Sequence, residues 1–220
     1  MKSKLFRLTL CFTILGLFTG CVFTLGGIRG SGIIKTESRE VNTFSSISFK
    51  SVGKLKIQQT GKESLTIIAE DNILPILESR VSNQTLYISN ANKSSIDPTQ
   101  PIEFVVEVKS LERLDINGVG SIEVKDIQGK RLSVSLDGVG SIAIAGNVDV
   151  LELNLDGVGS FNGEDLNAKQ ATVRNKGVGS AVVNVSEELN ATVLGIGSIE
   201  YIGSPQVKES VKGMGAIKKR

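Results

Sequence analysis

One tetrapeptide returns along the second half of the chain at nearly constant spacing. It reads Gly-Val-Gly-Ser in four copies, then Gly-Ile-Gly-Ser, then Gly-Met-Gly-Ala. The six copies begin at Gly118, Gly138, Gly157, Gly177, Gly195 and Gly213. Their spacings of 20, 19, 20, 18 and 18 residues are about half the length of a four-stranded propeller blade. The repeat therefore limits the fold to a stack of short, similar units.

The residues around each tetrapeptide alternate between apolar and polar. Leu114 and Ile116 precede the first copy with Asp115 between them, and Ile122 and Val124 follow it. Alternation with a period of two is typical of a strand that buries one face. Each unit is then a strand, a glycine corner, a second strand and a looser return. No unit has room for a helix, which excludes leucine-rich and helical repeats.

These units predict an all-β fold, a right-handed parallel β-helix with about 18–20 residues per coil. Each strand would pair with its copy in the next coil, about 4.8 Å away. Glycine suits the corner because it has no Cβ and lets stacked copies approach closely. The pattern leaves open whether the row beginning at Val119 and the serine row beginning at Ser121 face inward or outward.

The first half of the chain repeats this pattern less regularly. Val52-Gly53 aligns with Val119-Gly120, and residues 71–78 resemble a short helix with Asp71 or Asn72 as its cap. We expect one β-helix domain over residues 33–220, with irregular coils over 33–110 and regular coils over 111–220. Further strands are expected at Leu65–Ala69, Thr85–Ser89 and Ile102–Val108.

The N-terminus has the form of a signal peptide, which we assign to residues 1–20. Three basic residues lie within the first seven positions, and residues 8–18 form an apolar run too short to span a bilayer. The pattern predicts export from the cell.

Gly20-Cys21 resembles the lipobox of bacterial lipoproteins, in which the cysteine is acylated and becomes the new N-terminus. Phe18 departs from that motif, which usually has leucine there, so cleavage by an ordinary signal peptidase is the alternative. A single free thiol is unexpected in an oxidising compartment outside the cytoplasm, and acylation of Cys21 would account for it. We expect Cys21 to carry the lipid, residues 21–32 to form a flexible tether, and Val22 to favour the outer membrane. The anchored protein would face the periplasm or the cell surface.

The composition argues against several classes of function. Without the three basic residues of the signal peptide the chain has 22 basic and 23 acidic residues, so it lacks the positive charge expected of a nucleic-acid-binding protein. It contains no histidine, the commonest general base and transition-metal ligand. We therefore expect neither catalytic residues nor a metal or other cofactor.

The opening of the domain resembles a known family. The resemblance rests on three segments: residues 39–47 (REVNTFSSI), residues 52–57 (VGKLKI) and residues 65–74 (LTIIAEDNIL). With the later glycine repeats they are similar to the family described as "putative auto-transporter adhesin, head GIN domain", over about residues 34–220. The resemblance implies a right-handed β-helix on a bacterial envelope protein, and it supplies no catalytic residues.

One polar row is a weak candidate for binding. Asn117, Asp137 and Asp156 precede the glycines of three successive coils and should stack. A carboxylate row could hold a cation or a polysaccharide. Asn and Asp before Gly also bond to their own turn, and the row continues as Lys176, Leu194 and Lys212, which suits no single site.

The sequence favours a non-enzymatic envelope lipoprotein whose β-helix displays a rigid surface to an envelope protein or glycan, with adhesion as one use. Two alternatives remain. One is a polysaccharide-active or calcium-binding β-helix enzyme, and the other is a structural module that associates end to end.

The lipid anchor gives a first testable prediction. Intact mass and metabolic labelling with a fatty acid should detect acylation of the wild-type chain, and Cys21→Ser should abolish both the added mass and membrane association. If Cys21→Ser left membrane association unchanged, the prediction of a lipid anchor would be refuted.

Overall fold

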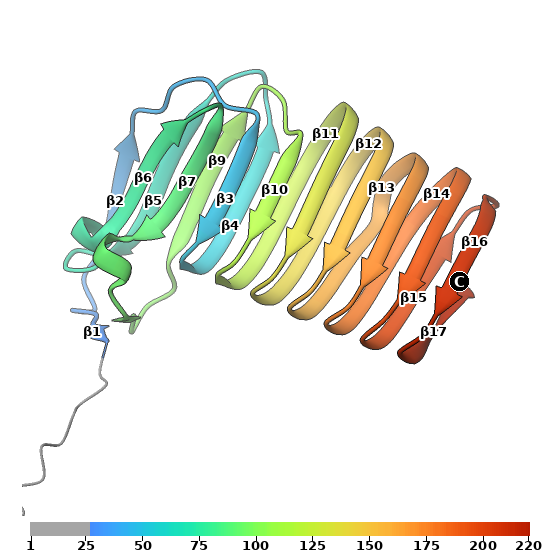
Figure 1. Cartoon of the computed structure of the whole chain (residues 1–220). Helices are drawn as coiled ribbons and strands as arrows, with labels where there is room; N and C mark the ends of the chain where they lie inside the picture. The colour runs from blue at the N-terminus through green and yellow to red at the C-terminus, as the bar shows by residue number, and fades with distance from the viewer. Residues whose placement is uncertain (1–26) are drawn as a thin grey trace, which may run out of the picture.

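The computed structural model describes residues 27–220, so the predicted signal peptide and Cys21 lie outside the described residues. The described chain is nearly all β, with 72% strand and 3% helix, and forms a β-solenoid of about 5 turns. Figure 1 shows the regular coils stacked side by side, with the N-terminal strands at one end. The predicted fold class is confirmed.

The regular coils are parallel throughout. The strands of this part are β10 (Arg113–Ile116), β11 (Val119–Leu136), β12 (Val139–Leu155), β13 (Val158–Asn175), β14 (Val178–Val193), β15 (Ile196–Ile202), β16 (Gln206–Val211) and β17 (Met214–Lys219). Each copy of the tetrapeptide lies directly beside the next, as in the pair Val119 and Val139. The register therefore follows the 18–20-residue spacing of the sequence repeat.

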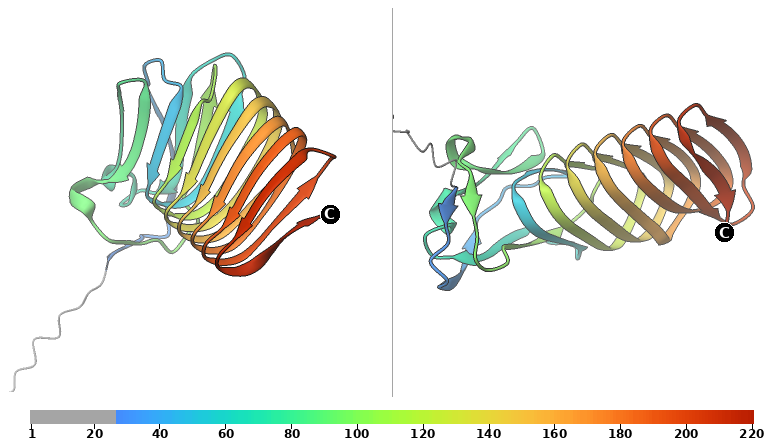
Figure 2. Two further views of the ribbon diagram at one scale, coloured as in Figure 1. Left: turned by 45° about the vertical axis from the view of Figure 1, so that its right-hand side comes forward. Right: turned by 90° about the horizontal axis from the view of Figure 1, so that it is seen from below.

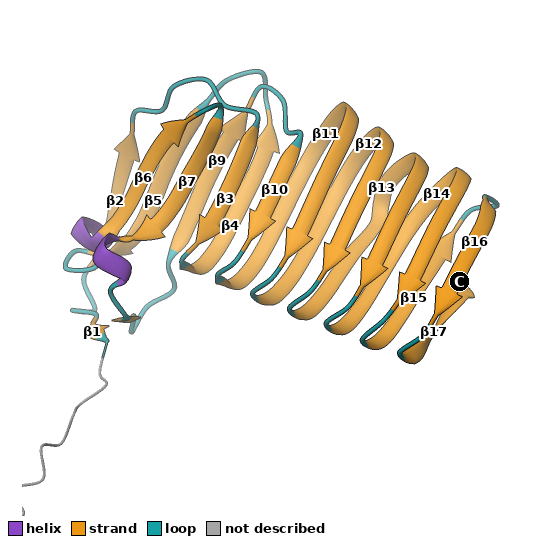
Figure 3. Ribbon diagram, in the orientation of Figure 1, coloured by secondary structure: helices purple, strands orange, loops and turns teal. Residues whose placement is uncertain are grey.

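The path of one coil gives the hand of the solenoid. In Figure 1 the chain rises on the far side, bends at the top, descends on the near side and advances from left to right, which is a right-handed turn. The long strands β11 to β14 each cover both sides of a coil, and short loops remain at the lower corner (Figure 3). These loops begin the glycine tetrapeptides.

The interior is filled by stacked aliphatic rows. Alternate side chains of each strand point inward, so the residues that pair between coils also pack on one another. One such row runs through Ile122, Ile142, Phe161, Ala181 and Ile199, all of them buried. Burying a large aliphatic side chain contributes roughly 1.5–3 kcal/mol. The repeated inward rows therefore supply most of the stability.

The glycine corner is shaped by close approach between coils. The Val158 amide donates to the carbonyl oxygen of Gly138, and the Val178 amide to that of Gly157, each at 3.0 Å. A Cβ on Gly159 would lie 1.8 Å from the Gly140 carbonyl oxygen. No side chain fits between these stacked backbones, so the requirement for glycine is mainly steric.

Two sets of N-terminal strands extend the two sides of the solenoid. On one side β10 is followed by β3 (Ser46–Lys50), β7 (Thr85–Asn90) and β6 (Leu77–Ser82); on the other, β11 is followed by β4 (Val52–Gln59), β9 (Glu103–Val108), β5 (Ser64–Glu70) and β2 (Ile34–Arg39). The strands expected at 65–69, 85–89 and 102–108 correspond to β5, β7 and β9. Strands β2, β5 and β6 pair antiparallel with their neighbours, and β3 and β4 pair in parallel. Strands β7 and β9 each make one parallel and one antiparallel pair.

The expected helical segment is shorter than the sequence suggested. Residues Leu74–Ile76 form a 3-10 helix (η1), and its N-cap residue is Ile73, without a side-chain cap. The prediction of Asp71 or Asn72 as the cap is wrong. Their side chains bind the N-terminal segment instead: Asp71 accepts from the Ser31 hydroxyl, and Asn72 accepts from the Ser31 amide.

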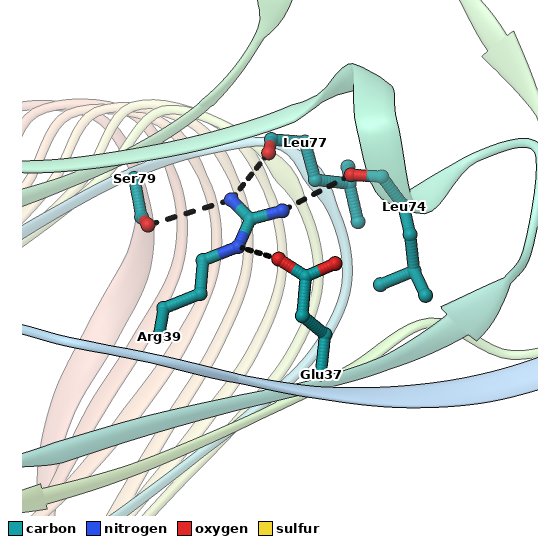
Figure 4. A network of polar contacts seen from close by, with 5 residues as sticks. All are labelled: Glu37, Arg39, Leu74, Leu77 and Ser79. Atoms are coloured by element: carbon teal, nitrogen blue, oxygen red, sulfur yellow. Dashed lines mark hydrogen bonds and ion pairs between the residues drawn. The ribbon is translucent and has the colours of Figure 1, made fainter.

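Arg39 ties β2 to this helix and to β6 (Figure 4). Its guanidinium donates to the carbonyl oxygen of Leu77 at 2.5 Å and to that of Leu74 at 3.1 Å, and it pairs with the Glu37 carboxylate at 2.8 Å. The Leu74 carbonyl oxygen already accepts from the Leu77 amide, which closes η1, so Arg39 adds a second hydrogen bond to it.

The N-terminal segment is docked on the domain through Glu70. Strand β1 (Ile28–Arg29) pairs with β8 (Ile96–Asp97), beyond the short 3-10 helix η2 (Ala91–Lys93). The inaccessible Glu70 carboxylate accepts from the Gly32 amide at 2.6 Å and from the amide and hydroxyl of Thr99 at 2.9 and 2.5 Å. Residues 28–32, at the end of the predicted tether, thus lie against the solenoid.

The corner predicts a large effect of a single methyl group. Gly179→Ala should lower the free energy of unfolding by at least about 3 kcal/mol, because its Cβ would lie 1.6 Å from the Gly159 carbonyl oxygen. Gly129→Ala is the control, since its Cβ would meet nothing closer than 3.8 Å. Urea denaturation of both variants measures the difference, and a gap below about 1 kcal/mol would contradict the steric account.

The docking of residues 28–32 should depend on pH and weaken in acid. Burial raises the pKa of Glu70, but hydrogen bonds from Thr99, Gly32 and Gln100 outweigh it, and the pKa lies below 4.5. The carboxylate therefore stabilises docking above about pH 4.5, and this contribution is lost as the pH falls through the lowered pKa.

Hydrogen exchange should show the amides of residues 28–32 losing protection in acid. Glu70→Gln should expose the same amides at neutral pH and flatten the pH dependence. Equal protection of these amides in the variant and the wild type at pH 7 would refute the role of Glu70.

Candidate binding surface

Three parallel rows of side chains cover the outside of the glycine corner. In the first coil Asn117, Val119 and Ser121 are exposed, whereas Gly118 between them is buried and Gly120 is partly buried. The glycines take the inward positions, so the residues around them must point outward. The same alternation of exposure holds in the next three coils, and the corner carries a flanking row, an aliphatic row and a serine row.

The flanking row contains the three residues singled out in the sequence. Asn117, Asp137 and Asp156 lie in successive coils, all exposed; the Asp137 amide donates to Ile116 O and the Asp156 amide to Leu136 O. The row continues through Lys176, Leu194 and Lys212. The Asp156 carboxylate pairs with the Lys176 ammonium of the next coil at 3.4 Å. Across residues 27–220, His, Cys, Asp and Glu side chains nowhere gather three together in a way that could hold a metal ion.

Asp137 also acts on a carboxyl group beside the corner. Burial raises the pKa of Asp115, and the Asp137 carboxylate one coil away raises it further. The Arg113 guanidinium and the Lys50 ammonium lower it in part. The acidic part of the flanking row therefore makes the local electrostatic potential negative, as the raised pKa of Asp115 indicates.

The aliphatic row is exposed along its whole length. The exposed fraction is 36% at Val52, between 47% and 50% in the five central coils, and 68% at Met214. Its members are Val52, Val119, Val139, Val158, Val178, Ile196 and Met214. Threonine is also β-branched and would favour the strand conformation equally well at these positions. The backbone alone therefore does not require an aliphatic side chain here. A contiguous exposed apolar strip of this kind is typical of an interaction surface.

A second set of side chains lines the opposite bend of the coils. Asn167 donates to the Asn147 side-chain oxygen at 3.0 Å, and Asn184 donates to that of Asn167 at 3.1 Å. We call these three residues the amide row; Gln128 pairs in register with Asn147 at its start. The spacing of the tetrapeptide does not reveal this row, because the register shifts in the bends, next to these residues.

The amide row lies in a groove of about 310 Å³. Its other walls include Asp149, Lys169 and Ser186, and the Lys169 ammonium pairs with the Asp149 carboxylate at 2.7 Å. That hydrogen bond and the charge of Asp149 raise the pKa of Lys169. The groove is therefore polar and its charges are balanced.

Another hollow, of about 500 Å³, lies on the side formed by β4, β5, β9 and β11. Three of its charged side chains form ion pairs: Glu123 contacts Lys125 at 2.7 Å and Lys54 at 3.2 Å. Hydrogen bonds from these two lysines lower the pKa of Glu123.

Within residues 27–220, no helix has the length and apolar character that crossing a bilayer requires.

The stacked coils and their outward rows define a β-solenoid that displays side chains in straight lines along its length. Residues 43–205 match the family described as "Putative auto-transporter adhesin, head GIN domain". The chain belongs to this family, as the resemblance in the sequence predicted. The family is described in terms of adhesion and not of catalysis, which is typical of exported or surface-associated proteins.

Several solved structures resemble the chain, among them the following two. A "putative adhesin" from Bacteroides fragilis is 26% identical, with a TM-score of 0.74; the match covers 88% of this chain and 100% of that one. A "putative lipid binding protein" from Parabacteroides distasonis is 24% identical, with a TM-score of 0.58 and coverage of 88% and 99%, and shares the fold. A comparison with curated proteins found no match.

Proposed function

We propose that this chain is a non-enzymatic adhesive protein of the cell envelope, which binds a neutral glycan along its amide row. The observation that carries the proposal is the groove in which equivalent amide side chains recur in consecutive coils. The backbone ladders hold these side chains rigidly, so little conformational entropy is lost on binding.

The amide row retains hydrogen-bonding capacity for a ligand. An asparagine side chain has two N–H donors and an oxygen with two acceptor sites. Asn167 uses one donor on Asn147 and one acceptor site on Asn184, which leaves one of each free. A sugar hydroxyl offers the matching donor and acceptor.

The spacing and the charge of the groove favour a linear, neutral polymer. Amides in adjacent coils repeat about every 4.8 Å along the solenoid axis, so a chain with regularly placed hydroxyl groups can contact several of them. The ion pair between Lys169 and Asp149 leaves the groove without a net charge to attract an ionic ligand.

The proposal includes an address in the envelope. Acylation at Cys21 would anchor the exported chain to the outer membrane, with the solenoid facing the periplasm or the cell surface. Supporting this address are the sequence of residues 1–22 and the description of the family as adhesins.

Binding to neutral cell-surface polysaccharide tests the function. Asn167→Ala should weaken binding at least about tenfold, because it removes the central amide of the row and both of its ladder bonds. Isothermal titration of the exported chain with the purified polysaccharide measures the change, and circular dichroism checks that the variant is folded.

Asn117→Ala provides the matched control, because it removes an exposed amide from the glycine corner and should leave binding unchanged. Loss of binding in Asn117→Ala but not in Asn167→Ala would move the site to the corner. Turnover of the polysaccharide that Asp137→Ala plus Asp156→Ala abolishes would favour the enzyme instead.

A further inference from the structure

The aliphatic row lies at the glycine corner, opposite the bends that hold the amide row, so the glycan proposal leaves it unexplained. Figure 2 shows the stacked coils from the side of the corner, where each coil repeats the same turn. Between the coils of Asn117 and Lys212 the row advances five coil spacings, or about 24 Å. A straight apolar strip of that length needs a partner that is equally straight.

Charge beside the strip is distributed unevenly. The flanking row is acidic at Asp137 and Asp156 and basic at Lys176 and Lys212, so its sign reverses along the solenoid axis. On the other side of the strip the serine row is small and uncharged. A partner must therefore present the opposite order of charges on one side only.

We propose that the partner is a second copy of this chain, packed with its solenoid axis antiparallel and its aliphatic row against the first. A two-fold axis across the row, between Val158 and Val178, brings Val158 of each copy opposite Val178 of the other. The same axis brings Asp156 of each copy opposite Lys176 of the other. The contact is isologous, because one patch complements itself.

Other arrangements and occupants fit less well. With the two rows parallel, a two-fold axis along them would place the charged flanking row against the serine row, without charge pairing. An anionic lipid surface would repel Asp137 and Asp156, which lie directly beside the apolar strip. A glycan would find no hydrogen-bonding side chains in this row, which is aliphatic along its whole length.

The size of the patch sets the strength of the contact. Three rows spaced two strand residues apart, with their side chains, cover roughly 15–20 Å by 24 Å, or about 360–480 Å² per partner. Counted over both partners, this area is about 700–1,000 Å², which is below the standard size of a stable interface and within the range of weak, transient contacts. The dimer is therefore weak and reversible, and salt should weaken it by screening the paired charges.

Sedimentation velocity of the exported chain tests this inference, with Cys21→Ser present so that no acyl chain can contribute. The chain should dimerise between about 1 µM and 1 mM, and Val158→Thr plus Val178→Thr should raise the dissociation constant at least about tenfold. Ile34→Thr is the control, because it removes an exposed aliphatic side chain of β2 away from the corner.

Charge exchange tests the antiparallel register. Asp156→Lys should weaken the dimer because lysines then face each other, and adding Lys176→Asp should restore it by reversing both pairs. A monomer at every concentration, or a dimer that these variants leave unchanged, would overturn the inference. Binding to phosphatidylcholine vesicles that the threonine variants abolish would assign the row to a lipid surface and overturn it too.

Discussion

The structure depends on contact between the backbones of successive coils. At the glycine corner an amide of one coil donates to a carbonyl of the previous coil at about 3.0 Å, and no room is left for a Cβ. Hydrogen-bonded stacking at this distance recurs from coil to coil, so one steric requirement is repeated through the whole regular part. The glycines that meet it also determine which way every neighbouring side chain points.

This constraint turns the surface into straight rows. Because each coil is stacked in register on the last, a residue at one position of the repeat is followed by its equivalents along the axis. Variation in the sequence changes only the chemistry of a row: aliphatic at the middle of the corner, acidic then basic beside it, amide at the opposite bend. A scaffold of this kind separates stability, which lies in the buried rows, from recognition, which lies in the exposed ones.

The sequence predicted the strands and their register because two signals agreed, the alternation of side chains and the spacing of the tetrapeptide. It left the direction of the Val119 row open, since the glycines on either side carry no polarity; the inward position of those glycines now explains why valine faces water. The amide row was missed because register shifts in the bends disturb the period. The Glu70 contacts join segments 29 and 38 residues apart, a pairing that no local pattern reveals.

Through-hydrogen-bond couplings measured by NMR test the stacking most directly. The account predicts a coupling from the Val158 amide nitrogen to the Gly138 carbonyl carbon, and from Val178 to Gly157. These amides should also exchange slowly with solvent although their side chains are half exposed. Couplings to carbonyls within the same coil, or rapid exchange at these amides, would contradict it.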